Sequence, residues 1–189
     1  NGPRLEGEDG ELHGVDTDGF TSSDDGENTV GARVSLLPLA RLEIGLSGAW
    51  GDAAIVENDE LELVGDPARD YRVDGLDITY QRGDFDVRGE FISQKIGSAP
   101  LSVAPESAEW ETWYVQGAYK FGQARWEAVL RYTDFDSPHS DESQEQWAVG
   151  LNYLVTPSAM IKLGYESNDG LPGEQTDSDR WLLQVAYGY

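Results

Sequence analysis

The stretch EQWAVGLNYLVT, residues 145–156, alternates between apolar side chains and polar or small ones. One face of the extended chain is apolar and consists of Trp147, Val149, Leu151 and Tyr153. The opposite face consists of Gln146, Ala148, Gly150 and Asn152. A period of two residues is the pattern of a β-strand with one apolar face, and it recurs along the chain, whereas helical spacing is hard to find. The chain is therefore predicted to be all β.

Nine strands are expected, each close to the ~9–11 residues that a tilted strand needs to cross a bilayer. They are predicted at 29–38, 41–51, 71–81, 85–95, 110–121, 124–135, 145–156, 158–167 and 179–189. The connections alternate in length. The short ones are 39–40, 82–84, 122–123 and 157, and the long ones are 52–70, 96–109, 136–144 and 168–178. Tight turns at one end and long loops at the other are typical of antiparallel outer-membrane barrels. A soluble β-sandwich or lipocalin-type barrel is the alternative.

Aromatic residues gather at both ends of the apolar strand faces. Near the long loops we expect Trp50, Phe91, Trp113, Tyr132, Trp147, Tyr165 and Trp181. Near the short turns we expect Tyr80, Phe85, Tyr119, Phe121, Trp126, Tyr153, Tyr187 and Tyr189. Aliphatic residues such as Ile161, Leu163 and Leu183 lie between them. Two aromatic rings around an aliphatic belt are typical of a membrane barrel, because amphipathic rings favour headgroup depth.

The composition excludes several other classes. A net charge of -23 disfavours nucleic acid as a partner, because phosphates would be repelled. Aromatic residues make up 11% of the chain, which argues against disorder. The absence of cysteine removes disulfides and thiolate metal sites, and we expect no cofactor. Since the sequence begins at Asn1 without a signal peptide, we expect a processed or partial chain.

These features resemble the Gram-negative porins. The hairpins at 110–135 and 145–167, followed by the aromatic-ended strand 181–189, look most like the C-terminal half of the phosphate-selective porin O/P-like family. In that resemblance, Tyr189 matches the terminal aromatic that the barrel-assembly machinery reads. The resemblance implies a water-filled channel in the cell outer membrane for small ions or solutes, in contact with lipid and lipopolysaccharide. It is also compatible with a homotrimer.

Nine strands form an odd number, whereas bacterial single-chain barrels have even numbers. The porins that this chain resembles have roughly 16–18 strands, wide enough for an aqueous channel, so the resemblance implies that this chain is about half of a barrel. Strands missing from the N-terminal side, or a second chain, would complete it. On this topology residues 1–28 form an acidic extracellular loop and residues 29–189 form the transmembrane strands. A tenth strand hidden in 1–28 or 52–70 is the alternative.

The charges sort by position. The long connections and residues 1–28 hold most of the acids, and their only bases are Arg4 and Arg69. The polar strand faces are mixed, and we expect the pore to be lined by Arg33, Arg41, Glu43, Arg88, Glu90, Lys120, Arg125, Glu127, Arg131, Lys162, Glu166 and Arg180. The arginines on this face would form an electropositive wall that favours anions. The alternative, which we prefer, is that they pair with glutamates on neighbouring strands and brace the barrel.

Two other features leave alternatives open. Loops 52–70 and 96–109 contain enough apolar residues that they either fold into the lumen as a constriction or extend the strands above the membrane. Residues Asp16, Asp18, Asp24 and Asp25 form a weak candidate calcium loop, since they do not complete the EF-hand pattern. A solvated acidic loop is preferred there, and divalent bridging to lipopolysaccharide is a further reading.

Catalysis and a structural role compete with the channel. Only His13 and His139 titrate near neutral pH, and neighbours in sequence such as Ser137 and His139 seldom form a triad. The chain is therefore not expected to be an enzyme, although an outer-membrane hydrolase remains an alternative. A barrel that sheathes or anchors a partner, such as an electron-conduit cytochrome, is the other one.

Overall fold

The computed structural model describes residues 3–8, 11–16, 29–55, 67–123, 125–139, 142–170 and 177–188, and its regular elements are β-strands. The strands are β1 (Arg4–Glu8), β2 (Glu11–Asp16), β3 (Thr29–Leu39), β4 (Leu42–Ile55), β5 (Arg69–Arg82), β6 (Phe85–Ile96), β7 (Ala108–Phe121), β8 (Trp126–Asp136), β9 (Gln144–Thr156), β10 (Ala159–Asp169) and β11 (Arg180–Tyr187). Within these residues no helix has the length and apolarity needed to span a membrane.

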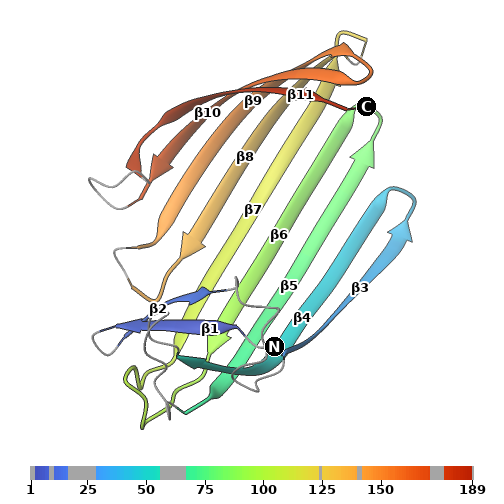
Figure 1. Ribbon diagram of the computed structural model, residues 1–189. Helices are drawn as coiled ribbons and strands as arrows, with labels where there is room; N and C mark the ends of the chain where they lie inside the picture. The colour runs from blue at the N-terminus through green and yellow to red at the C-terminus, as the bar shows by residue number, and fades with distance from the viewer. Residues whose placement is uncertain are drawn as a thin grey trace. The chain divides into compact units, whose positions relative to one another are not determined.

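All nine predicted strands are present as β3 to β11. Neighbours along the chain pair in the order β11-β10-β9-β8-β7-β6-β5-β4, and β3 pairs with β4 (Figure 1). The register between β7 and β8, and between β8 and β9, is antiparallel and unbroken. Within the described residues the strand order is open, with β11 at one end and β3 and the β1–β2 hairpin at the other. An antiparallel meander with an open order is what a piece of an up-and-down barrel would show.

Three of the short connections rely on residues with positive φ. Gly83 has φ of 62°, Arg41 has 76°, and the consecutive residues Gly122 and Gln123 have 58° and 60°. This left-handed conformation matches the twist of two-residue hairpin turns, and glycine adopts it without a steric penalty. These turns hold consecutive strands at a fixed register. The apolar residues of each strand therefore face the same side of the sheet as those of the next strand.

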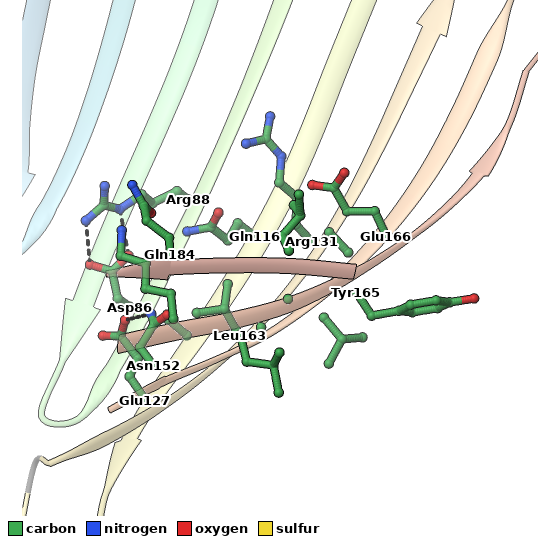
Figure 2. A pocket seen from close by; sticks show the side chains of 18 of the residues that line it. Asp86, Arg88, Gln116, Glu127, Arg131, Asn152, Leu163, Tyr165, Glu166 and Gln184 are labelled. Carbon is green, nitrogen blue, oxygen red and sulfur yellow. Dashed lines mark hydrogen bonds and ion pairs between the residues drawn. The ribbon is translucent and has the colours of Figure 1, made fainter. Parts of the chain in front are cut away.

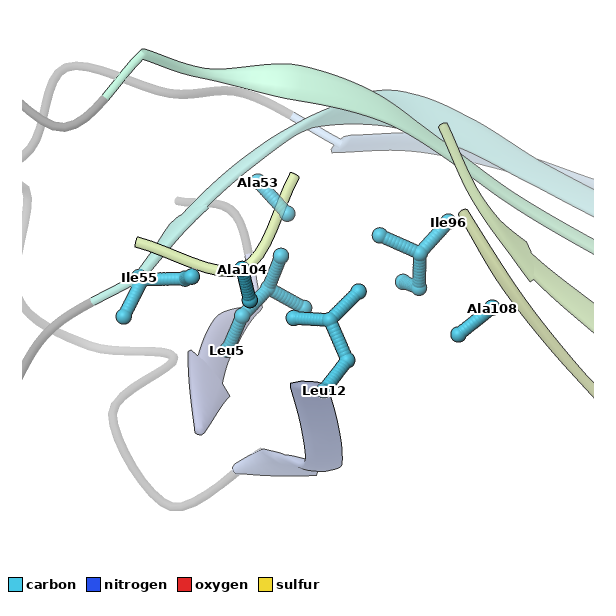
Figure 3. Packing of buried hydrophobic residues seen from close by; sticks show 7 residues of the cluster. All are labelled: Leu5, Leu12, Ala53, Ile55, Ile96, Ala104 and Ala108. Atoms are coloured by element: carbon cyan, nitrogen blue, oxygen red, sulfur yellow. The ribbon is translucent and has the colours of Figure 1, made fainter. Parts of the chain in front are cut away.

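By its internal contacts the chain divides into two compact units. Unit 1 contains Asn1–Val34, Leu46–Gly75 and Ser93–Trp110, and unit 2 contains Ser35–Gly45, Leu76–Ile92 and Glu111–Tyr189. Unit 1 holds the buried apolar cluster, which is made of Leu5, Leu12, Ala53, Ile55, Ile96, Ala104 and Ala108 (Figure 3). Among the described residues, the cluster is confined to this unit.

The β1–β2 hairpin in unit 1 lies within the segment 1–28, which the sequence predicts to be an extracellular loop. Its two strands pair with each other, and β1 also pairs in parallel with the end of β4 through Leu5 and Ile55. Gly7 stands at a register shift in β1, and a Cβ there would lie 2.9 Å from the Ile55 side chain. Strands of five and six residues are too short for alternation to reveal them in the sequence.

The cluster also explains why the strands run further than predicted at the long-connection end. Predicted strand 41–51 continues to Ile55, and predicted strand 110–121 begins at Ala108. Both residues are buried against Leu5 and Leu12 of the hairpin. Of the two readings of the apolar loops, strand extension therefore holds for Ile55 and Ile96. Val56, Leu61, Leu63 and Val64 lie outside the described residues.

Unit 2 shows the reverse of a soluble protein's burial pattern. In β9 the apolar residues Trp147, Val149 and Leu151 are exposed, and their polar or small neighbours are half-buried. The residues expected to face lipid follow the same rule: Leu183 is 74% exposed, Leu163 46% and Ile161 40%. A soluble barrel would bury these aliphatic rows in a dry centre. Exposed apolar rows on consecutive strands require a lipid surface instead.

Ring contacts join several neighbouring members of the two predicted aromatic rows in unit 2. At the short-turn end, Phe85 contacts Tyr119, Phe121 stacks with Trp126, and Trp126 lies 4.4 Å from Tyr153 between ring centres. At the long-connection end the contacts join Trp113 to Tyr132, Tyr132 to Trp147 and Tyr165 to Trp181. Tyr189 lies outside the described residues. Aromatic side chains in two bands are the arrangement of interfacial girdles.

Candidate channel-lining face

The polar face of unit 2 is built from three cross-strand rows that the registers define. The outer row, nearest the long connections, consists of Gln116, Arg131, Ala148, Glu166 and Arg180. The middle row consists of Ala118, Val129, Gly150, Gly164 and Leu182. The inner row consists of Lys120, Glu127, Asn152, Lys162 and Gln184. Two polar rows thus enclose a row without charge.

A hollow of about 510 Å³ lies over these rows. Its charged lining consists of Asp86, Arg88, Lys120, Glu127, Arg131, Lys162 and Glu166. Figure 2 shows Arg131 and Glu166 extending from the same side of the strands, while the Tyr165 ring points away from them. The lining therefore mixes both signs, with one more base than acid.

Some of these charges are paired, as the bracing interpretation predicts. The Arg180 Nε atom donates to Glu166 Oε2 at 2.5 Å across β10 and β11. Lys120 lies 4.0 Å from Glu127, and the Asn152 amide also donates to Glu127. These contacts join directly opposite residues of neighbouring strands, which is the geometry that stabilises a sheet.

Arg88 is paired differently from the prediction. Its guanidinium bonds to Asp86, two residues earlier on the same strand and the same face, rather than to a glutamate on a neighbouring strand (Figure 2). Gln81 on β5 donates a further hydrogen bond to Asp86. Side chains two apart in a strand share a face, so this contact satisfies Arg88 locally.

Arg131 and Lys162 differ from the other cations that line the hollow. Within the described residues neither has an ion pair with a carboxylate. The Arg131 guanidinium instead lies 3.9 Å above the Tyr114 ring, and its Nε donates to Thr133 Oγ1 at 3.1 Å. The polar face therefore combines braced pairs with cations that keep their charge available.

The other predicted lining residues lie apart from the hollow. Arg33 is on β3, Arg41 is in the turn before β4, and Arg125 is in the turn before β8. Glu43, Glu90 and Arg180 are on β4, β6 and β11 but do not line it. Their position on the wall of a channel stays a prediction.

Several neutral residues that line the hollow were not singled out from the sequence. They include Gln81, Gln116, Asn152 and Gln184, and the small residues Gly150 and Gly164. They alternate in phase with the charged residues, so the sequence places them on the same face of the strands. The prediction of lining residues rested on charge and therefore did not include these neutral hydrogen-bonding groups.

Unit 1 presents a second polar feature at its long-connection end. Arg69 is 3% exposed, and one of its terminal nitrogens donates to the Ala104 carbonyl at 2.8 Å. The other bonds to the Ser102 hydroxyl. This arginine therefore fastens the connection between β6 and β7 to the start of β5, in the place where the sequence suggested only a loop base.

The remaining candidates do not assemble a site in the described residues. The Ser137 hydroxyl donates to Glu142 and accepts from the His139 backbone, which braces the connection between β8 and β9. Ser140 and Asp141, and the side chains of the calcium candidates Asp16, Asp18, Asp24 and Asp25, lie outside the described residues. No group of three potential metal ligands occurs in the part of the chain that the structure covers.

Comparison with known protein families identifies the family of this chain. The family model of the Gram-negative porins matches residues 7–189. This chain belongs to the Gram-negative porins. The match concerns the porins as a family, and the narrower resemblance to phosphate-selective porins stays a prediction. None of the curated protein sequences is similar enough to this porin to count as a relative.

Two solved structures share the fold of this porin. One is a loop L8 deletion mutant of OmpT, an outer membrane protein of Vibrio cholerae, with a TM-score of 0.59 and 16% identity over 88% of this chain and 56% of that chain. The other is in-vitro folded OmpT in its trimer form, with a TM-score of 0.53 and 15% identity over 88% and 54%. This porin chain therefore spans a little over half the length of each neighbour. Together with the family match, they identify an outer-membrane β-barrel protein.

Proposed function

We propose that this porin chain forms about half of the wall of a water-filled channel through which small ions or solutes diffuse passively. The observation that carries the proposal is the burial pattern of unit 2. Apolar side chains on consecutive strands are exposed, and the polar side chains lie on the other face, over a hollow. A membrane barrel with lipid outside and water inside satisfies both faces at once.

A weak preference for anions is part of the proposal. Arg131 and Lys162 carry charges that no nearby carboxylate neutralises in the described residues, and the lining of the hollow has one more base than acid. Charges on a channel wall select ions by their field. The acidic long connections oppose this preference from outside, so we expect a small selectivity rather than a phosphate filter.

The barrel is proposed to need further strands. The strand order is open at β3 and β11 within the described residues, and the match covers only a little over half of each solved neighbour. Unpaired strand edges cannot face lipid, because each unsatisfied backbone group there costs several kcal/mol. Additional strands of a longer polypeptide, or a second chain, would pair with these edges. The trimer form of the OmpT neighbour supports testing for a homotrimer.

The protein is also proposed not to be a hydrolase. The Ser137 hydroxyl is bonded to Glu142 and to the backbone of His139, an arrangement that braces the loop. A His139→Ala variant is the check: loss of a measurable hydrolysis by the purified protein would overturn this part of the proposal.

Planar-bilayer recording of the intact protein tests the channel itself. We expect discrete current steps and a reversal potential, in a KCl gradient, that gives an anion-to-cation permeability ratio slightly above one. Folded protein that inserts without conducting would contradict the channel. That result would favour a barrel that sheathes or anchors a partner.

A further inference from the structure

Two cations in the hollow stand out by their position. Arg131 lies in the outer row on β8, and Lys162 lies in the inner row on β10. The rows are four residues apart, which is about 13 Å along a strand, and β8 and β10 are separated by two strand spacings, about 10 Å. Both side chains are long and line the same hollow, one from its outer row and one from its inner row.

Arg131 is held in place before any ligand arrives. Stacking on Tyr114 occupies one face of its guanidinium, and the bond to Thr133 occupies Nε. The terminal nitrogens have no hydrogen-bond partner in the described residues. They form the planar fork that binds a carboxylate through two parallel bonds. Because the side chain is already ordered, binding costs little additional conformational entropy.

The surroundings do not neutralise these two cations. Glu166 is engaged by Arg180, Glu127 by Asn152 and Lys120, and Asp86 by Arg88. Between the two cationic positions lies the middle row, whose lining side chains are uncharged: Ala118, Val129, Gly150, Gly164 and Leu182. A ligand that fits this surface carries an anion at each end and an apolar segment between them.

We propose that Arg131 and Lys162 form a two-point binding site for short aliphatic dicarboxylates on their way through the channel. Arg131 binds one carboxylate through its terminal nitrogens, and Lys162 binds the other. The methylene chain lies along the middle row. This site rests on the proposed channel, whose wall it occupies, and it assigns a solute class to a face that otherwise shows only mixed charge.

The test compares adipate with hexanoate, which has the same number of carbons and one carboxylate. Each is added to the intact protein in a planar bilayer, and the concentration that halves the KCl current is measured. Adipate is expected to block at a lower concentration than hexanoate. Arg131→Gln and Lys162→Gln should each raise the adipate value about threefold or more, as loss of one exposed charge contact implies. The double variant should lose the difference between the two acids.

Arg125→Gln is the matched control, because Arg125 is a cation in the turn before β8 and does not line the hollow. It should leave the adipate value unchanged. Equal potency of adipate and hexanoate in the wild type, or equal effects of all three single variants, would overturn the site while leaving the channel intact. Should the folded protein not conduct, calorimetric titration of adipate in detergent decides separately: no heat of binding overturns the site, and binding that requires both cations supports it.

Discussion

Glu166 and Arg180 form an exposed ion pair on the polar face, and each half can be removed alone. Glu166→Gln removes a negative charge and should raise the anion-to-cation permeability ratio, whereas Arg180→Gln should lower it. A unit charge about 8 Å from an ion's path in water changes the ion's energy by about 0.5 kcal/mol, which is roughly a twofold change in permeability. Reversal potentials in a KCl gradient measure the ratio. Shifts of the same sign in both variants would contradict this placement.

Leu183 and Gln184 are neighbours in β11 with opposite parity, so they provide a matched pair for the membrane assignment. Leu183→Arg places a charge in the lipid and should lower the free energy of unfolding by about 2–4 kcal/mol. Gln184→Arg places the same charge on the polar face and should cost less than about 1 kcal/mol. Urea unfolding of the protein in lipid vesicles measures both. Equal costs would remove the basis for a lipid-facing row.

Asp179, in the connection before β11, gives a pH dependence. The Tyr165 hydroxyl, and then the Asn168 backbone N–H, donate to its carboxylate and lower the pKa of Asp179 below its usual value. A lowered pKa means that this contribution to stability is present above about pH 4, the ordinary aspartate pKa, and is lost as the pH falls through the lower value.

The variant Asp179→Asn should therefore unfold at a lower urea concentration than the wild type at pH 7. As the pH falls through the lowered pKa of Asp179, the wild-type carboxyl also becomes protonated, and the difference should shrink. A difference between the two proteins that stays constant across this range would show that the charge of Asp179 does not matter.

The β1–β2 hairpin is the element whose role is easiest to test. Its Leu5 and Leu12 side chains pack on Ile55 and Ile96 (Figure 3). Ile55 and Ile96 have odd and even numbers, as the polar positions of β4 and β6 do, so we expect the hairpin to lie on the channel side of unit 1. Leu12→Ala should cost about 2–5 kcal/mol of local stability, as for other buried leucines. Limited proteolysis should then cut residues 4–16 faster, and the single-channel conductance should increase.

Leu101→Ala is the control for the hairpin prediction, because Leu101 is 92% exposed in the connection between β6 and β7. It should change neither the cleavage rate nor the conductance. Faster cleavage without any change in conductance would show that the hairpin does not restrict the ion path.

The long strands were predictable because each satisfies two signals at once. In β9 the alternation from Gln146 to Tyr153 and the aromatic residues at both ends agree with each other, and the structure reproduces both. The β1–β2 hairpin was not predictable in this way. Its stability comes from contacts with Ile55, Ile96 and Ala104, which are distant in sequence, and no local pattern encodes such packing.

The sequence predicted which residues lie on the polar face, but not which of them form ion pairs. Parity placed Arg88, Arg131 and Lys162 on the polar face, and all three line the hollow. Which of them keeps a free charge depends on rotamers and neighbours. Arg88 turns to Asp86 on its own strand, whereas Arg131 stacks on Tyr114. Which partner each arginine contacts depends on side-chain geometry over a few ångströms. The alternation of the sequence does not encode that geometry.

At the scale of the whole molecule, the net charge of -23 should make selectivity depend on salt. Most of the acids belong to residues 1–28 and the long connections, which we place at the channel entrance. The Debye length falls from about 10 Å at 0.1 M to about 3 Å at 1 M salt, so these acids repel anions less in concentrated salt. The anion-to-cation permeability ratio should therefore rise between 0.1 M and 1 M KCl. A constant or falling ratio would place the acids away from the ion path.

The register of β8, β9 and β10, which is continuous in β10 from Met160 onward, has a consequence for how the barrel assembles. A shift of one residue in a hairpin would exchange the two faces of a strand, so that Arg131 and Lys162 would meet lipid in place of Leu130 and Leu163. Each cation that faced lipid near the bilayer midplane would cost about 2–4 kcal/mol. We therefore expect the bilayer to disfavour misaligned strand pairs while the barrel forms.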